Sequence, residues 1–172
     1  FFPIFFKQYW SQDAVITEST FYLGIGNSLA SLVIVILAPV LGAMADTGGL
    51  RKRMLAGFAS LGILATGALY LVQAGMWPFA ILLYAIAVVG FSGANTFYDA
   101  LLVIVAPPNK RHRVSAFGFA LGYLGGGILF LVNVLMTLKP HIFGLADAAE
   151  GVRWSFISVA VWWTLFSIPL FL

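Results

Sequence analysis

A line of hydrogen-bonding side chains runs along the apolar stretch 78–106, and one of its members is a carboxylate. The four residues have offsets of zero, three, four and seven, which puts them on one face of a helix. Hydroxyl and amide groups can orient a polar solute, and one protonatable carboxylate is the minimum that coupling to a proton requires. The candidates for substrate binding or coupling are Ser92, Asn95, Thr96 and Asp99, together with Tyr98 beside them.

Asp99 is the only acidic residue deep inside any apolar stretch. The stretch ends at Ala106, and at a helical rise of about 1.5 Å per residue Asp99 lies roughly 10 Å inside that boundary. A charge at the bilayer centre costs on the order of 3 kcal/mol on insertion scales, so this carboxylate requires a partner, water or a proton. We keep three interpretations: a structural pair with Lys110 or Arg113, a role in coupling, and contact with a missing half of the protein.

The elements that position these residues follow from composition. Of the 172 residues, 62% are hydrophobic and 9% are charged, whereas a soluble domain carries about 25% charged residues. A soluble fold of this size could not bury so much apolar surface, and helices span lipid because every backbone group must be paired internally. We therefore predict one unit over 1–172, an all-α, polytopic transmembrane helix bundle. Its spans are 21–45, 54–74, 78–106, 114–138 and 154–172, with 1–9 as the tail of a truncated first span.

Basic residues indicate how the bundle is oriented. Loops 46–53 and 107–113 hold six of the nine Lys and Arg residues, so the positive-inside bias places both loops in the cytoplasm. Tyr9, Trp10, Trp77 and Trp154 then fall near the outer interface as an aromatic belt. The basic clusters are short and explained by topology, so no nucleic acid is expected as a partner. The sequence contains no cysteine, metal-ligand spacing or phosphate-binding loop, and we expect no cofactor or metal ion.

Two further spans carry faces of small residues that favour close helix packing. An alternative interpretation is that these faces slide against a partner half of the protein. The span 21–45 contributes Gly24, Asn27, Ser28 and Ser31. The span 114–138 contributes Gly118, Gly122, Gly125, Gly126 and Asn133.

The loop after the second span resembles a signature of major facilitator transporters, Gly-x-Leu-Ala-Asp-Arg-x-Gly-Arg-x-x-Arg/Lys. Gly42, Ala45, Asp46, Gly49 and Arg53 match it. This resemblance implies a gating loop formed by Gly42, Asp46, Gly49, Arg51 and Arg53. In it, Asp46 would meet a helix N-terminus of the other half and the arginines would pair with carboxylates.

The segments 97–102, 106–108, 113–115 and 119–127 resemble the vacuole-effluxer-like branch of the major facilitator superfamily. The resemblance runs over most of the chain. It implies the N-terminal six-helix half of a twelve-helix transporter in a bacterial inner membrane, which works by alternating access on small solutes, amino acids among them. The expected partners are the lipid bilayer, a C-terminal six-helix half or a second copy, and a small-molecule substrate. A non-transporting scaffold or receptor on the same fold is the alternative, and a membrane enzyme is disfavoured because only one carboxylate lies within the spans.

Overall fold

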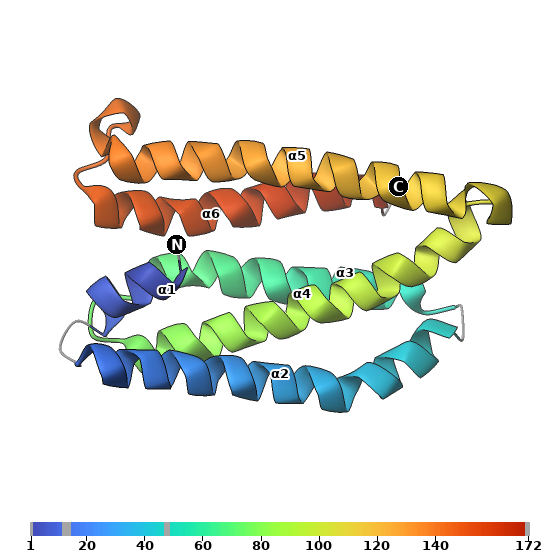
Figure 1. Cartoon of the computed structure of the whole chain (residues 1–172), viewed down its shortest axis with the longest axis horizontal. Helices are drawn as coiled ribbons and strands as arrows, with labels where there is room; N and C mark the ends of the chain where they lie inside the picture. The colour runs from blue at the N-terminus through green and yellow to red at the C-terminus, as the bar shows by residue number, and fades with distance from the viewer. Residues whose placement is uncertain (1, 12–14, 47–48, 171–172) are drawn as a thin grey trace.

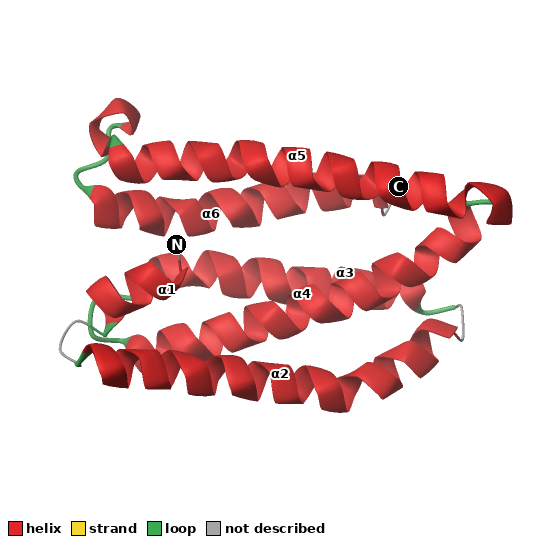
Figure 2. Cartoon of the chain, viewed as in Figure 1, coloured by secondary structure: helices red, strands yellow, loops and turns green. Residues whose placement is uncertain are grey.

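In the computed structural model, which describes residues 2–11, 15–46 and 49–170, the chain is a bundle of helices (Figures 1 and 2). No strand occurs within those ranges. A short α1 (Phe2–Phe5) continues into a π-helical turn (Phe6–Trp10). Five long helices follow, each long and apolar enough to cross a membrane. They are α2 (Ile16–Asp46), α3 (Arg51–Ala68), α4 (Trp77–Val105), α5 (Arg111–Leu138) and α6 (Ala148–Ser167).

Short 3₁₀ turns extend or connect these helices. They are Leu69–Leu71, Pro108–Lys110, Pro140–Phe143 and Ile168–Leu170. The all-helical fold predicted from composition is confirmed. Because the long helices run antiparallel to their neighbours in sequence, the turns fall at two ends of the bundle (Figure 1).

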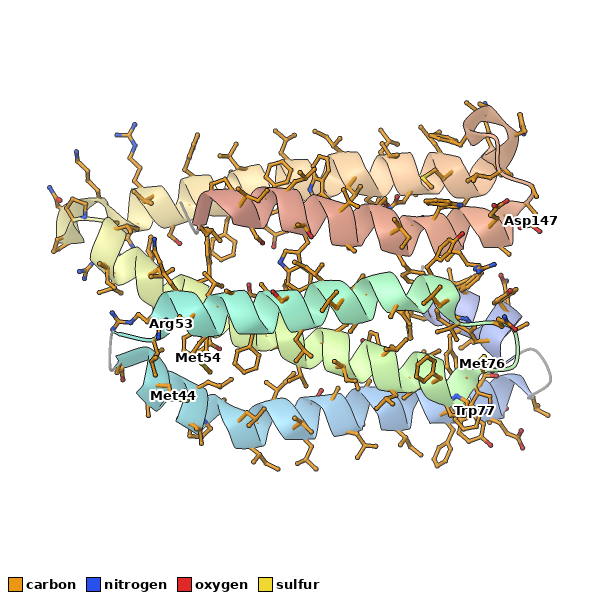
Figure 3. The ribbon with its side chains drawn as sticks, turned by 180° about the vertical axis from the view of Figure 1, so that it is seen from behind. Met44, Arg53, Met54, Met76, Trp77 and Asp147 are labelled. Carbon is orange, nitrogen blue, oxygen red and sulfur yellow. The ribbon has the colours of Figure 1, made fainter. Side chains whose placement is uncertain are left out.

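We name these two ends by their residues. The basic end holds the α2–α3 and α4–α5 turns, and the aromatic end holds the α3–α4 and α5–α6 turns with the π-helical turn. Figure 3 shows Met44, Arg53 and Met54 at the basic end and Met76, Trp77 and Asp147 at the other. The alternation of loops on which the sidedness prediction depends is therefore present in the fold.

Several helices begin earlier than the hydropathy pattern suggests. The structure starts α3 at Arg51 and α5 at Arg111, whereas the sequence predicted loops up to 53 and 113. It starts α6 at Ala148 rather than at 154, because Asp147 caps the helix. The Asp147 carboxylate accepts a hydrogen bond from the Glu150 amide at 2.8 Å, and the Glu150 carboxylate accepts one from the Ala146 amide at 2.6 Å. This reciprocal pair satisfies amides that the first helical turn leaves open.

The central contact of the bundle joins α3 to α4 at glycines. A Cβ added at Gly90 of α4 would lie 2.5 Å from the backbone nitrogen of Gly62 in α3, so the two backbones touch. On its other side α4 packs against α2, where Gly26 lies directly on Ile81. Close backbone approach of this kind is how helices associate in lipid, where no hydrophobic driving force acts between them.

The helices α5 and α6 form a second pair, which joins the rest of the bundle through α6 and α3 (Figure 1). Asn133 of α5 is buried, and its Oδ1 accepts a hydrogen bond of 2.8 Å from the Ser158 hydroxyl of α6. A Cβ at Gly151 would come within 2.5 Å of the Met136 carbonyl oxygen. The helix α4 approaches α5 only near the turn that connects them.

Large apolar side chains cover the outside of the bundle. Leu64 and Val105 are each 72% exposed, and Phe117 is 66% exposed. Such an apolar surface would be unfavourable in water but is favourable in the hydrocarbon core of a bilayer. The chain is an integral membrane protein.

Buried residues gather into two clusters, one near each end. The aromatic-end cluster is Phe5, Phe6, Trp10, Leu69, Val72, Ala80, Leu83, Val152 and Phe156. The basic-end cluster is Leu41, Ala45, Leu55, Ala59, Ala94 and Phe97. The expectation that Trp10 lies in an interfacial belt is wrong, because its side chain is 0% exposed. Trp154, at 39% exposed, is placed as a belt residue would be.

Candidate functional site

The predicted polar stripe exists and lies on the face of α4 that is turned away from α3. Asn95 and Asp99 are exposed, and Ser92 and Thr96 are partly buried, whereas Phe97 on the opposite face is fully buried. The Thr96 hydroxyl donates to the Ser92 carbonyl oxygen at 3.0 Å, which is a local bond within the helix. The stripe therefore offers one amide and one carboxylate to whatever occupies the space beside α4.

Asp99 makes no hydrogen bond or ion pair within the part of the chain that the structure describes. The structural pair with Lys110 or Arg113 is not present among the described residues, and both basic side chains are exposed. Without such a pair, the Asp99 charge is left to water, a proton, a ligand or contact with the missing half of the protein.

A cavity of about 1030 Å³ opens between α4 and α5, and Asp99 is on its wall. Lys52, from the first turn of α3, lines the same cavity, so one cation and one carboxylate face a space whose walls are otherwise mostly apolar. Sequence reading missed Lys52, because only the fold brings the start of α3 near α4 and α5. The other lining residues used below are Tyr98, Ser115, Gly118, Gly122, Tyr123 and Gly126.

Tyr98 and the glycine face of α5 meet across this cavity. Tyr98 is 46% exposed, and a Cβ added at Gly118 would lie 3.8 Å from its hydroxyl oxygen. Gly122 and Gly126 have open space around them. Of the predicted substrate or coupling residues, Asp99 and Tyr98 thus line the cavity. Ser92, Asn95 and Thr96 are not among its lining residues.

The predicted gating loop has a different arrangement from the one that the signature suggested. Asp46 is the last residue of α2, and Arg51 is the first of α3. Arg51 donates through Nε to the Ala45 carbonyl oxygen and through Nη2 to the Asp46 carbonyl oxygen at 3.2 Å. It therefore caps the C-terminus of α2, where the helix dipole favours a cation. The carboxylate pair expected for Arg51 is not what the structure shows. Arg53 is exposed and Gly42 and Gly49 have open space around their Cα atoms.

Arg111 repeats this arrangement at the end of α4, and sequence reading missed its role. Its Nε donates to the Ala106 carbonyl oxygen at 3.3 Å and its Nη2 to the Val103 carbonyl oxygen at 3.0 Å. A signal was present, since Arg51 and Arg111 each follow the break after a long apolar run. Arg153 does the same for the 3₁₀ turn after α3, with Nε 3.0 Å from the Tyr70 carbonyl oxygen.

The predicted small-residue faces are mostly open in this chain. Gly24, Ser28 and Ser31 of α2 are exposed, and a Cβ at Gly24 would meet nothing within 4 Å. Asn27 accepts a hydrogen bond of 3.2 Å from the Tyr84 hydroxyl of α4. On α5, Gly125 faces Trp162, with Trp162 Cζ2 at 3.8 Å from an added Cβ. The glycines that bring helices of this bundle together are therefore different ones, above all Gly26, Gly62 and Gly90.

The fold and the site define a class: a helical membrane protein with an unpaired carboxylate beside a large cavity. The comparisons with known proteins specify that class. Residues 9–172 match the family described as vacuole effluxer Atg22 like. The chain is 36% identical over 171 residues to the uncharacterized MFS-type transporter YxiO of Bacillus subtilis (strain 168), an alignment that covers 98% of this chain and 40% of that relative. No solved structure matches.

The chain belongs to the Atg22-like family of major facilitator transporters. It spans about 40% of the length of the curated relative it matches. The family resemblance drawn from the loop signature and from the segments on α4 and α5 is confirmed.

Proposed function

We propose that these helices form the N-terminal half of a secondary active transporter that moves a small solute by alternating access. The observation that carries the proposal is Asp99, a carboxylate with no partner among the described residues, on the wall of a cavity of about 1030 Å³ in a chain of this family. A solute or a proton that binds there replaces the missing partner of the charge. Family membership makes a transporter the fitting class, and the relative carries that description.

The finer parts of the proposal have separate supports. Amino acids are proposed as substrates from the family resemblance, and the presence of one carboxylate and one lysine on the cavity wall suits a zwitterion. A C-terminal six-helix half or a second copy is proposed as the partner, and the open faces of α2 and α5 support it. We propose that the basic end lies in the cytoplasm of a bacterium whose inner membrane holds the protein.

The test is solute flux in proteoliposomes that contain the full-length protein. Radiolabelled neutral, basic and acidic amino acids are supplied with and without a proton gradient. Asp99→Asn is expected to reduce uptake at least about tenfold, because an amide can neither exchange a proton nor pair with a cation. Glu18→Gln, which changes an exposed carboxylate at the start of α2, is the matched control. Unchanged uptake and gradient dependence in Asp99→Asn would remove this residue from the mechanism.

A non-transporting receptor on the same fold predicts a different result. Such a protein would bind a labelled solute in detergent, and Asp99→Asn would weaken that binding, but no variant would accumulate solute in liposomes. Flux above that of empty liposomes excludes this alternative.

A further inference from the structure

Trp10 occupies the centre of the aromatic end. Its side chain is 0% exposed, and its indole Nε1 donates a hydrogen bond of 3.1 Å to the Val72 carbonyl oxygen, just beyond the 3₁₀ turn that ends α3. The bond is buried, and it links two segments that lie far apart in the sequence. A buried indole keeps such a bond because an unpaired N–H inside the protein is costly.

Aromatic rings surround Trp10 on several sides. Its ring stacks on Phe156 of α6 at 5.6 Å between centroids and meets Phe5 edge-on at 4.9 Å. Phe2 contributes a third contact at 5.4 Å. With Ala80 of α4, which is also 0% exposed, these residues close the space between α1, α3, α4 and α6.

At the basic end, the buried cluster around Phe97 joins α2, α3 and α4, but no residue of α5 belongs to it. There the cavity beside Asp99 separates α4 from α5, and its wall residues Tyr98, Ser115 and Tyr123 are partly or largely exposed. The described helices are therefore packed together across α1, α3, α4 and α6 at the aromatic end, and a cavity lies between α4 and α5 at the basic end.

The backbone that carries Trp10 is unusual as well. Phe6–Trp10 forms a π-helical turn, in which the Ser11 amide donates to the Phe6 carbonyl oxygen at 2.9 Å. The Ser11 hydroxyl donates to the same oxygen at 2.8 Å, and its oxygen lies 2.9 Å from the hydroxyl oxygen of Ser19 in α2. Turns of this type are rare and frequently occur at functional sites. Conversion to α-helix removes one residue from the turn, which rotates the next side chain by about 100° around the axis.

We propose that Trp10 is the positioning residue that holds the aromatic end closed, and that the π-helical turn lets it leave its place when that end opens. The inference rests on the proposed alternating-access function. In this proposal, the Trp10 indole and its bond to Val72 set the balance between the states that are closed and open at the aromatic end. Loss of the ring is expected to favour the state that is open at the aromatic end and closed at the basic end.

The experiment uses introduced cysteines as reporters, because residues 1–172 contain no cysteine of their own. Ala80→Cys reports on the aromatic end and Ser115→Cys on the basic end. Each is placed in the full-length protein, with other accessible thiols removed, and labelled in proteoliposomes with a membrane-impermeant maleimide. Trp10→Ala, Trp10→Phe and the control Trp154→Ala, which changes an exposed ring at the same end, are then combined with each reporter.

Trp10→Ala is expected to raise the labelling rate at Ala80→Cys by about tenfold and to lower it at Ser115→Cys, since a large-to-small change removes the packing of one state only. Trp10→Phe keeps a ring but removes the hydrogen-bond donor of the Val72 carbonyl oxygen, so the labelling rate at Ala80→Cys is expected to rise about threefold. Trp154→Ala should change neither rate. Reciprocal changes at the two reporters distinguish a shift between states from a loosened fold, which would raise both rates together.

Two results would overturn the inference: parallel increases at both reporters, or no change at Ala80→Cys in Trp10→Ala. Failure of the proposed function has a different signature, because flux would be absent while the two reporters still respond reciprocally. The matched Trp10→Phe protein covers the case in which Trp10→Ala does not fold. If Trp10→Phe then labels like wild type at both sites, the inference is rejected.

Discussion

The two ends of the bundle hold their helices by different means. At the aromatic end, Trp10 and Phe156 pack in a buried cluster with a single indole hydrogen bond to Val72. At the basic end, Arg51 and Arg111 bind the carbonyl oxygens that end α2 and α4. Ring packing fixes several helices against one another at once. An arginine cap stabilises the turn that carries it, and the packing of α2, α3 and α4 at this end comes from the cluster around Phe97, which α5 does not join. The comparison explains how one end can be closed while the other holds a cavity.

The largest effect on stability is expected at the contact between α3 and α4, which lies between the two ends of the bundle. Gly90→Val would put side-chain atoms where the backbone of Gly62 lies, so α3 and α4 could not keep their spacing. Overpacking of this severity costs several kcal/mol, about 3 or more, and the folded fraction should fall sharply. Monodispersity and thermal unfolding in detergent measure it. Gly57→Val, at a position of α3 with open space, is the control. Equal stability of the two variants would show that the α3–α4 contact is not needed.

The next effect tests the aromatic end. Phe156→Ala should destabilise the protein by about 3 kcal/mol, because it opens a void next to Trp10 in a closed cluster. Phe166→Ala removes a 63% exposed ring from the same helix and should cost far less. Thermal unfolding of both variants gives the comparison. Similar losses in the two would mean that the aromatic cluster does not hold this end together.

The smallest effect tests the basic end. Arg111→Ala removes two bonds to the C-terminus of α4, and since the side chain is only partly buried we expect about 1 kcal/mol. Arg113→Ala, two positions on, removes an exposed charge and should be close to neutral. Arg111→Lys should recover only part of the loss, because an ammonium cannot reproduce the guanidinium fork. Thermal unfolding at low and at high salt separates the capping bonds from general charge. A larger loss in Arg113→Ala than in Arg111→Ala would contradict the capping role.

Composition and hydropathy were sufficient for the type of fold and for the order of its spans, because a lipid-facing helix needs a long apolar run wherever it packs. They could not place helix starts such as Ala148. Polar residues that cap a helix look like loop residues until their hydrogen bonds are seen. Trp10 is the sharpest case. An aromatic residue at the end of an apolar run fits an interfacial belt as well as a core, and only the positions of α3 and α6 decide between them.

In the candidate site, too, the sequence predicts some residues and only the fold brings in the others. The stripe that includes Asp99 follows from helical periodicity within one span, so the sequence was enough to find it. Lys52 enters the site from another helix, and the caps formed by Arg51 and Arg111 depend on backbone atoms that a sequence pattern does not display. Contacts between elements distant in sequence are therefore what the pattern could not provide.

The caps of Arg51 and Arg111 also bear on how the protein enters its membrane. Each ties the start of one helix to the end of the helix before it, although α2 and α3 pack against α4 rather than against each other, so what the cap holds is a positively charged turn. A turn held in this way does not depend on the packing of its two helices against each other. In the orientation that we propose, the positive charge of each cap stays on the cytoplasmic side, and the terminal carbonyls of α2 and α4 meet the membrane already satisfied.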